Sequence, residues 1–339
     1  MTIRILGIET SCDETAAAVV EDGHVILSNI VASQAEFHAQ YGGVYPEMAS
    51  RMHLEVIASV VEEALVSAHL GWGDLDAIAV TYGPGLPGSL LVGLNFAKGA
   101  ALVEDLPLVP VNHLEGHFYA HWLDVVHEDR PSDHLRFPLL ALIVSGGHTE
   151  LVLATDHGQY ERLGSTRDDA AGEAFDKVAR MLKLGYPGGP AIEEAAQVGD
   201  PAVFNLPRAW LPDTYDFSFS GLKTAVLRTL QKYSGSVPPQ FYNNMAAAFQ
   251  ESVVDVLVGK TARAAREYAV RAVLLSGGVS ANTRLRERAR AEIPVPVYML
   301  PKILCTDNAA MIAAAGYFRF QAGDRAGWDL DIDPGLQLK

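Results

Sequence analysis

The sequence predicts an α/β protein with two related domains, and three observations support this. At 339 residues the chain is longer than one hydrophobic core usually serves. Short apolar runs alternate with glycine-rich loops and with helical patterns, the order typical of α/β folds. Each half also contains a pair of predicted strands around a hydroxyl-rich turn, which indicates an internal duplication.

The first half supplies three predicted strands, two helices and a further strand. Apolar runs predict strands at residues 3–8, 16–20 and 25–27, the first two flanking a turn rich in hydroxyls and carboxylates. Apolar residues at helical spacing predict a helix from Pro46 to Gly71, with proline at its start and glycine at its stop. A strand at residues 77–80 then leads through a glycine and proline loop into an apolar helix that continues to Ala101.

The second half repeats this pattern. Strands predicted at residues 139–144 and 150–153 flank the turn Ser145-Gly146-Gly147-His148-Thr149. A strand at residues 272–275 runs into a second glycine turn and a basic helix, and the last helix is predicted from Asn308 to about Phe320. The charged segment at residues 124–136 has no apolar period and is predicted to be a solvated loop.

Composition narrows the class of protein. With 49% hydrophobic and 20% charged residues, the chain has the make-up of an ordinary soluble globular protein. Polar residues interrupt its most apolar stretch, residues 89–111, and the N-terminus enters a strand pattern directly, so we expect no membrane span, no leader and a cytoplasmic location. Two distant cysteines make no disulfide framework. A net charge of −15 argues that the chain does not hold a polyanion such as nucleic acid unaided.

The histidine pair His113 and His117 is the strongest chemical signal. Their four-residue spacing places both imidazoles on one face of a helix, where they can bind one metal ion. Imidazole suits zinc or iron, and a carboxylate would complete a catalytic set. Asp307, at a loop-to-helix junction, is the best third ligand, although an aspartate there also fits a helix N-cap.

Glu115 lies between the two histidines but does not reproduce a metalloprotease motif. Such proteases place the glutamate directly after the first histidine, whereas Glu115 is two positions on and faces away from the pair. Gly116 also weakens a regular helix at this point. Peptide hydrolysis therefore lacks its usual base.

Two glycine pairs at strand ends favour nucleotide binding. Gly146-Gly147 and Gly277-Gly278 each follow a serine, and such turns let backbone amides approach phosphate oxygens. Tight turns need glycine for backbone reasons as well. Asn282 can bond a base or ribose, or cap the helix that follows it.

Motifs spread over nearly the whole chain carry a resemblance to a known family. They lie at residues 7–15, 46–53, 83–90, 112–117, 145–149, 169–177, 187–190, 276–282 and 306–312. Through them the chain resembles the TsaD family, the bacterial tRNA N6-adenosine threonylcarbamoyltransferases formerly described as O-sialoglycoprotein endopeptidases or glycoproteases. The resemblance implies the fold of actin, Hsp70 and sugar kinases, in which two related α/β domains enclose a nucleotide. We expect the first domain at residues 1–112 plus 308–339 and the second at residues 113–307.

The resemblance also implies a set of site residues. His113, His117 and Asp307 would hold one divalent metal per subunit, with Fe²⁺ favoured and Zn²⁺ the alternative. No catalytic residue is identified, and the candidates are Glu9, Thr10 and Glu14. The family's adenylate contacts fall on Ile143, Val144, Ser145, Gly146, Gly147, Asp176, Gly189, Glu193 and Asn282. Glu193 stands where we expect the family's shorter aspartate.

The implied reaction transfers threonylcarbamoyl from threonylcarbamoyl-AMP to N6 of the adenosine beside the anticodon, in tRNAs that read codons beginning with A. The resemblance implies two partners, an inactive paralogue (TsaB) and a small ATPase (TsaE). A metalloprotease and a nucleotide-dependent scaffold or switch are the alternatives. The arginines of the basic helix at residues 284–290 form either one edge of a composite tRNA surface or a solvated face.

Overall fold

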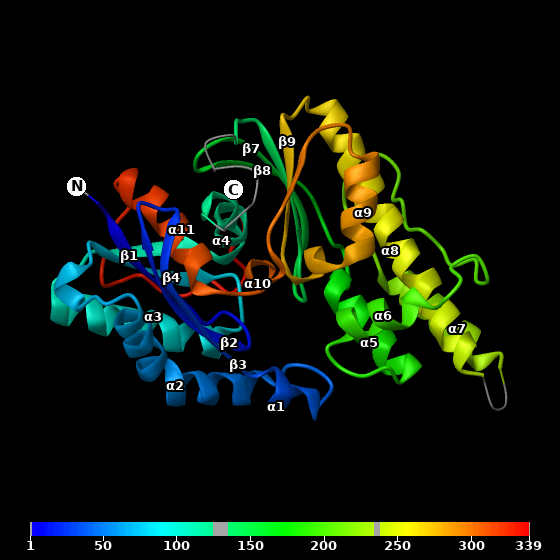
Figure 1. Cartoon of the computed structure of the whole chain (residues 1–339), viewed down its shortest axis with the longest axis horizontal. Helices are drawn as coiled ribbons and strands as arrows, with labels where there is room; N and C mark the ends of the chain where they lie inside the picture. Colours follow the sequence, from blue (N-terminus) through cyan, green and yellow to red (C-terminus); the bar gives the residue numbers. More distant parts are fainter. Residues whose placement is uncertain (1, 125–134, 234–237, 339) are drawn as a thin grey trace. The chain divides into compact units, whose positions relative to one another are not determined.

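The computed structural model describes residues 2–124, 135–233 and 238–338, and these form two compact units (Figure 1). Unit 1 is Met1–Leu135 with Thr306–Lys339, and unit 2 is Arg136–Cys305. Most of the predicted charged loop, residues 125–134, lies outside the described residues.

Unit 1 is built on a mixed five-stranded sheet in the order β3-β2-β1-β4-β5. The first three strands are antiparallel, and β4 and β5 add in parallel to β1. The four predicted strands of this half are confirmed, the first shifted by one residue and the other three longer, and β5 is an additional strand that was not predicted. The five strands are β1 (Arg4–Glu9), β2 (Glu14–Glu21), β3 (Val25–Ser33), β4 (Ala77–Gly83) and β5 (Leu108–Asn112).

Helices cover both faces of the unit 1 sheet. Side chains such as Leu6 and Ile8 pack with α2 and α3 in one core, whereas the other face is covered by α11. A Cβ on Gly7 would lie 2.3 Å from the carbonyl oxygen of Ala309, so glycine lets α11 lie directly on β1. The helices are α1 (Ala35–Ala39), α2 (Pro46–Ser67), η1 (Trp72–Asp74), α3 (Pro87–Glu104), α4 (His113–Tyr119), η2 (Ala120–Trp122) and α11 (Ala309–Gln321).

The end of α2 differs from the sequence prediction. The helix stops at Ser67 rather than at Gly71, because His69 takes the left-handed conformation with φ of 57° that glycine was expected to supply. Leu70 then donates a backbone hydrogen bond to the carbonyl of Leu65, which closes the helix end.

Unit 2 repeats the strand topology of unit 1. Its sheet has the order β10-β9-β6-β7-β8, with β6, β7 and β8 antiparallel and β9 and β10 added in parallel to β6. The two sheets therefore match strand for strand, and the predicted duplication is confirmed. The strands are β6 (Leu139–Val144), β7 (Thr149–Asp156), β8 (Gln159–Ser165), β9 (Ala272–Ser276) and β10 (Val297–Met299).

The main core of unit 2 lies between its sheet and a group of helices. It includes Leu142 of β6, Phe175 of α5 and Phe249 of α8, and the two phenylalanine rings meet edge to face at 5.1 Å. The helices are α5 (Ala171–Leu182), α6 (Gly188–Gln197), α7 (Ser220–Gln231), α8 (Pro239–Glu267), η4 (Gly278–Ala281), α9 (Thr283–Glu292) and α10 (Lys302–Cys305).

The unit boundaries differ from the expected domain bounds of residues 1–112 plus 308–339 and residues 113–307. Helix α4, with the segment after it, belongs to unit 1, and so does Asp307. The physical reason is packing, because α4 lies against α11. A Cβ on Gly116 would come 2.7 Å from Cδ1 of Ile312, so this glycine permits the close approach of the two helices.

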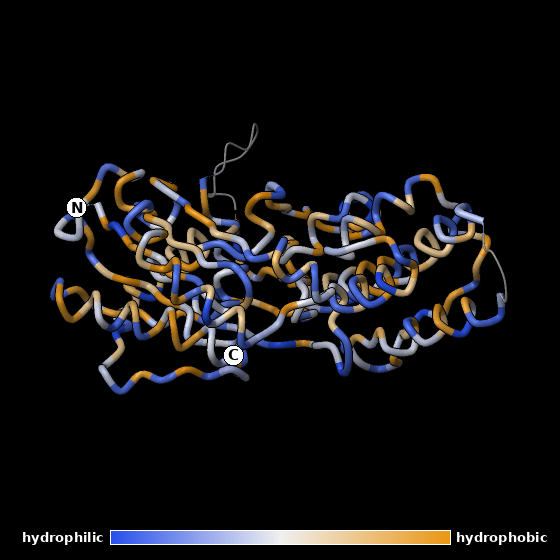
Figure 2. The backbone as a smooth tube through the Cα atoms, turned by 90° about the horizontal axis from the view of Figure 1, so that it is seen from below, coloured by the Kyte–Doolittle hydropathy of each residue, from blue (hydrophilic) through white to orange (hydrophobic). Residues whose placement is uncertain are grey.

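Hydrophobic stretches are short along the backbone, where orange and blue segments alternate in Figure 2. Among the described residues, no helix is both long enough and apolar enough to span a bilayer. Cys12 and Cys305 are both free thiols.

Candidate functional site

Helix α4 presents the histidine pair. It starts directly after β5, and Asn112 caps it by accepting a hydrogen bond from the amide of Leu114 at 2.8 Å. The rings of His113 and His117 are successive on one helix face, with centroids 4.8 Å apart. The predicted facing geometry is therefore present, and Gly116 serves helix packing.

Asp307 faces both histidines. Its Oδ1 lies 3.5 Å from Nε2 of His113 and 3.3 Å from Nε2 of His117. Asp307 does not cap α11, because Asn308 takes that role by accepting from the amide of Met311 at 3.1 Å. The neighbouring asparagine thus leaves the Asp307 carboxylate available to the histidines.

The three side chains fit a single metal ion. One ligand atom from each of His113, His117 and Asp307 lies within 4.8 Å of the others. Both histidines are buried, and Nδ1 of His117 has no hydrogen-bond partner among the described residues. Two nitrogen donors and one carboxylate oxygen that converge in this way match the ligand sets of catalytic zinc and non-haem iron sites.

Glu9 fixes the orientation of the His113 ring through a hydrogen bond. Its carboxylate is fully buried at the end of β1 and accepts from Nδ1 of His113 at 3.0 Å and from the hydroxyl of Thr81 at 2.6 Å. The amide of Ser11 also donates to it. With its Nδ1 proton held by Glu9, His113 turns Nε2 toward Asp307.

Charge balance in this cluster depends on the two carboxylates. Burial lowers the pKa of the His113 imidazole, but Asp307 and Glu9 outweigh that effect and raise the pKa to about 9. Burial also acts to raise the pKa of Glu9, yet the charge and hydrogen bond of His113 hold this pKa below its usual value. For His117, burial dominates and lowers the pKa. Two carboxylates and two imidazoles therefore make a site suited to a cation.

The other two catalytic candidates, Thr10 and Glu14, differ in their hydrogen-bond partners. Thr10 is buried and donates its hydroxyl to the carbonyl of Ser89 at 2.8 Å, which ties it to α3. Glu14, at the start of β2, accepts from the hydroxyl of Ser33 at 3.2 Å. Burial, together with the negative charges of Asp13 and Asp307, raises the pKa of Glu14 to about 9.

Glu115 faces away from the histidines, as predicted. It is buried and pairs with Arg319 of α11, so the pair joins α4 to α11. This long-range pair had no signal in the sequence. Glu115 is therefore not placed where the glutamate base of a metalloprotease would lie.

The first glycine turn of unit 2 is open to a ligand. Ser145 closes the turn, its amide donating to the carbonyl of His148 at 2.8 Å. Gly146 and Gly147 are exposed, and a Cβ built on either would meet nothing within 4 Å. The preceding Ile143 and Val144 are buried in β6, so their side chains serve the core.

The second glycine turn has a backbone reason of its own. Gly277 has φ of 85°, and a Cβ there would lie 2.4 Å from the carbonyl oxygen of Val144. Because β6 and β9 are parallel neighbours, both glycine turns lie at the carboxyl ends of adjacent strands. Ligands of α/β sheets commonly bind at such ends.

The remaining adenylate candidates join the helices around this edge. Asp176 accepts from the amide of Gly188 at 2.7 Å, at the start of α6, and Gly189 beside it has open space around its Cβ direction. Glu193 of α6 accepts from the amide of Thr283 at 2.9 Å. These contacts hold α5, α6 and α9 together.

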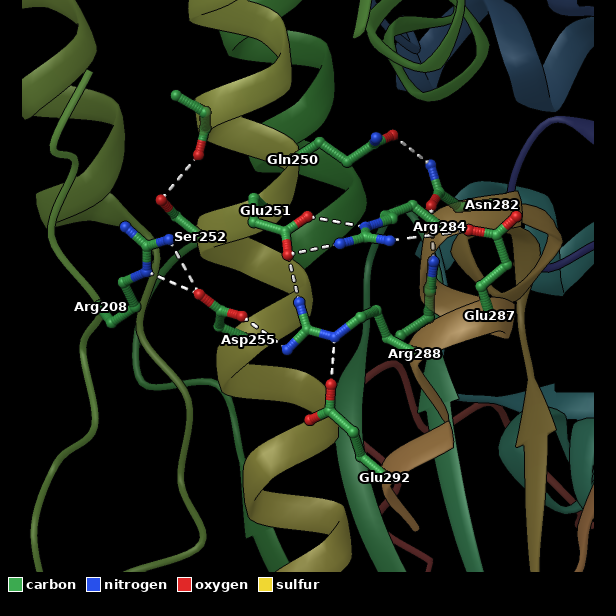
Figure 3. A network of polar contacts seen from close by, with 12 residues as sticks. Arg208, Gln250, Glu251, Ser252, Asp255, Asn282, Arg284, Glu287, Arg288 and Glu292 are labelled. Carbon is green, nitrogen blue, oxygen red and sulfur yellow. Dashed lines mark hydrogen bonds and ion pairs between the residues drawn. The ribbon is translucent and has the colours of Figure 1, made fainter. Parts of the chain in front are cut away.

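Asn282 performs the helix cap that was the alternative to ligand binding. Its Oδ1 accepts from the amide of Leu285 at 2.9 Å, and its Nδ2 donates to Gln250 of α8 at 2.7 Å (Figure 3). Gln250 is itself buried and was not anticipated from the sequence.

Comparison with protein families gives a match to TsaD, described as tRNA N6-adenosine threonylcarbamoyltransferase, over residues 25–314. Curated proteins with that same name are similar over nearly their full length. One from Thermomicrobium roseum is 57% identical, covering 98% of this chain and 96% of the relative. One from Dehalococcoides mccartyi is 56% identical, covering 99% of each, and one from Bacillus cereus is 55% identical, covering 99% and 96%.

Solved structures with low sequence identity share the fold. HypF from T. kodakarensis has a TM-score of 0.63 at 14% identity, covering 95% of this chain and 48% of that one. A full-length HypF bound to phosphate and nucleotide has a TM-score of 0.59 at 14% identity, with coverages of 96% and 56%. These likenesses confirm the expected fold class, two α/β domains of the actin and sugar-kinase type.

Proposed function

The chain belongs to the TsaD family of tRNA N6-adenosine threonylcarbamoyltransferases, and we propose that His113, His117 and Asp307 hold the metal ion used in that activity. The protein is a transferase that acts on tRNA in the biosynthesis of N6-threonylcarbamoyladenosine (t6A). The convergence of the three ligand atoms within 4.8 Å carries the metal proposal. We favour Fe²⁺ over Zn²⁺, and the donor set accommodates either ion.

The reaction joins an exocyclic amine to an activated carbonyl. N6 of adenosine attacks the carbamoyl carbon of threonylcarbamoyl-AMP, the new C–N bond forms, the C–O bond to phosphate breaks, and AMP leaves as the amine loses a proton. When bound, a divalent ion supplies positive charge that polarises the carbonyl or neutralises the phosphate and carboxylate of the donor. No covalent enzyme intermediate is required.

The chain's own residues would position the reactants. The exposed turn at Gly146 and Gly147 offers backbone amides to the phosphate of the adenylate. We propose that the adenylate binds at this turn and also contacts Gly189. Hydrogen bonds of three further candidates, Asp176, Glu193 and Asn282, hold the neighbouring helices in place. Glu9 keeps the Nδ1 proton of His113 in place, so that Nε2 remains available as a ligand.

Partner subunits are the natural complement of an acidic chain that acts on tRNA. Lys and Arg total 26 against 41 Asp and Glu, so further positive surface is needed to retain the polyanion. We propose an inactive paralogue (TsaB) and a small ATPase (TsaE) as these partners, with action in the cytoplasm. Neither a protease nor a scaffold is favoured, because Glu115 is paired with Arg319 and a scaffold needs no such ligand cluster.

Reconstitution tests this function directly. The purified chain and its partner subunits are mixed with threonylcarbamoyl-AMP and unmodified tRNA, and the digested nucleosides are analysed by mass spectrometry. We expect t6A to appear only when this chain is present. Absence of t6A from a folded, metal-loaded complex would contradict the assignment. A parallel assay for peptide cleavage should stay at background.

A further inference from the structure

Helix α7 lies in a part of the chain that has no acidic side chain. Residues 217–250 include Lys223, Arg228 and Lys232 but no aspartate or glutamate. With 41 acidic residues among 339, a stretch of this length would ordinarily hold about four. The local charge is therefore positive, although the whole chain carries −15.

The outward side of α7 presents this charge to solvent. Thr224, Arg228 and Lys232 follow one another at four-residue intervals, on one side of the helix and of the turn that ends it, and all three are exposed. We call these three residues the α7 basic face. The buried side of the helix is formed by Leu222 and Val226. Figure 1 shows α7 alongside α8 within unit 2.

Arg228 and Lys232 form no ion pair with any carboxylate in the described part of the chain. Lys223 is different, because it pairs with Asp169 at 2.6 Å and so fastens α7 to the segment before α5. Asp168 also accepts from the amides of Phe219 and Ser220, at 2.8 and 3.2 Å, which fixes the start of the helix. The basic face thus lies on a helix whose N-terminal end is anchored by an ion pair and two hydrogen bonds.

Helix α9, the basic helix predicted at residues 284–290, differs from α7 because two of its arginines have carboxylate partners (Figure 3). Arg284 makes a two-pronged contact with Glu251, at 2.8 and 2.9 Å. Arg288 contacts Glu251, Asp255 and Glu292. These carboxylates pair with the two arginines and link α9 to α8, so these two side chains are less available to phosphate than basic residues without a carboxylate partner.

We propose that the α7 basic face binds the phosphate backbone of tRNA during the transfer reaction. This inference rests on the proposed function, in which tRNA is the acceptor. Arginine and lysine that have no carboxylate partner release counterions when they meet phosphates, whereas paired ones must first lose their partners. The apolar Leu227 and the aromatic Tyr233 are exposed beside the face, but its own three side chains are polar or positively charged, which suits a polyanion.

Paired alanine substitutions test the proposal in the complete complex. The variant Arg228→Ala with Lys232→Ala removes both charges and keeps good helix formers. The control Arg266→Ala with Arg290→Ala removes the same charge from exposed positions on α8 and α9. For each complex, tRNA affinity is measured at several salt concentrations, and single-turnover transfer from threonylcarbamoyl-AMP is measured at increasing tRNA concentration.

The expected result separates the two pairs. Loss of the α7 charges should weaken tRNA binding about tenfold or more at low salt, and should reduce the slope of log affinity against log salt by about two. The transfer rate at saturating tRNA should stay near that of the wild-type complex, and the control pair should change neither quantity comparably.

Two outcomes would overturn the inference, and a third would contradict the proposed function instead. Equal tRNA affinity in the two paired variants would show that α7 has no special role. Unchanged tRNA affinity with loss of a partner subunit on gel filtration would show that the face binds protein instead. A wild-type complex that binds tRNA but transfers nothing would contradict the proposed function, and the binding data would still judge the α7 surface separately.

Discussion

Nδ1 of His113 lies 3.0 Å from the buried carboxylate of Glu9, although 104 residues separate them in the sequence. Through this contact a glutamate at a strand end supports a histidine that we propose as a metal ligand. Two neighbouring residues of the motif at residues 7–15 therefore have different roles. Glu9 accepts a hydrogen bond from His113, whereas Thr10 links the end of β1 to α3.

Substituting Glu9 by glutamine should weaken metal binding and leave the fold intact. Glutamine keeps the shape but removes the charge that holds His113, and loss of such outer partners typically costs 10- to 100-fold in metal affinity. The measurement is competition with a chelator of known affinity. Glu21→Gln is a suitable control, since Glu21 pairs with Arg4 on the same sheet. Equal affinity in both variants would show that Glu9 has no role at the metal.

Removal of any one ligand should have a larger effect. His113→Ala, His117→Ala and Asp307→Ala should each lose more than the roughly 100-fold in affinity expected for Glu9, since a donor atom itself is missing. Metal content by elemental analysis, transfer activity and far-ultraviolet circular dichroism are measured on each variant. His24→Ala, which alters a half-exposed histidine of unit 1, is the control. Full metal content in all three variants would refute the ligand set.

Two glycines near the first turn of unit 2 should behave differently when enlarged. Gly147→Val should change the free energy of unfolding by no more than about 0.5 kcal/mol relative to the wild type, because the new side chain enters open space. Gly172→Ala should destabilise the protein by about 1–3 kcal/mol, because its Cβ would lie 2.6 Å from the carbonyl oxygen of Ser145.

Adenylate affinity provides the second readout for these variants. Calorimetry should show weaker binding to Gly147→Val despite its normal stability, because the valine would occupy the space that the phosphate needs. If the adenylate bound Gly147→Val as tightly as the wild type, the turn at Gly146 and Gly147 would not be the phosphate site.

Asp169 should make stability depend on pH in the acid range. Burial raises the pKa of its carboxyl, but hydrogen bonds from Lys177 at 2.7 Å and Lys223 at 2.6 Å outweigh burial and hold the pKa below 3.8. A carboxyl with a lowered pKa in the folded state contributes stability above its unfolded value, and this is lost as the pH falls through the folded value. The free energy of unfolding of Asp169→Asn should therefore lie below that of the wild type at pH 7.

Urea unfolding of both proteins at several pH values checks this sign. The difference between wild type and Asp169→Asn should be constant near neutral pH and should shrink as the pH falls below about 4. A difference that stays the same down to acid unfolding would mean that the two lysines do not stabilise the charged carboxylate.

The site was predictable as far as residue type and local spacing reached. Four-residue spacing puts His113 and His117 on one side of any helix, and Asp307 was the natural third donor. The choice between metal ligand and helix cap for Asp307 needed the structure, because Asn308 is an equally good cap one position later. Asn282 does cap its helix, and its contact with the adenylate stays a prediction.

Charge patterns were less predictable. The arginines of α9 could be counted in the sequence, but Glu251 and Asp255, which neutralise two of them, lie on a different helix more than 30 residues away. Arg228 and Lys232 have no such partner in the described chain. Whether a basic residue is free to meet phosphate is a property of its spatial neighbours, and a count of charges along the sequence does not contain it.

The sequence by itself determined the α/β class, the duplicated hairpin and sheet pattern and the histidine pair, because strand and helix periodicity are local properties of the chain. Tertiary structure decided which side chains meet. Glu9, Thr81 and His113 come from β1, β4 and α4, and Arg319 reaches Glu115 across 204 residues. Such contacts depend on how the sheet orders its strands and on how closely α11 approaches β1 and α4, which glycines at positions 7 and 116 permit.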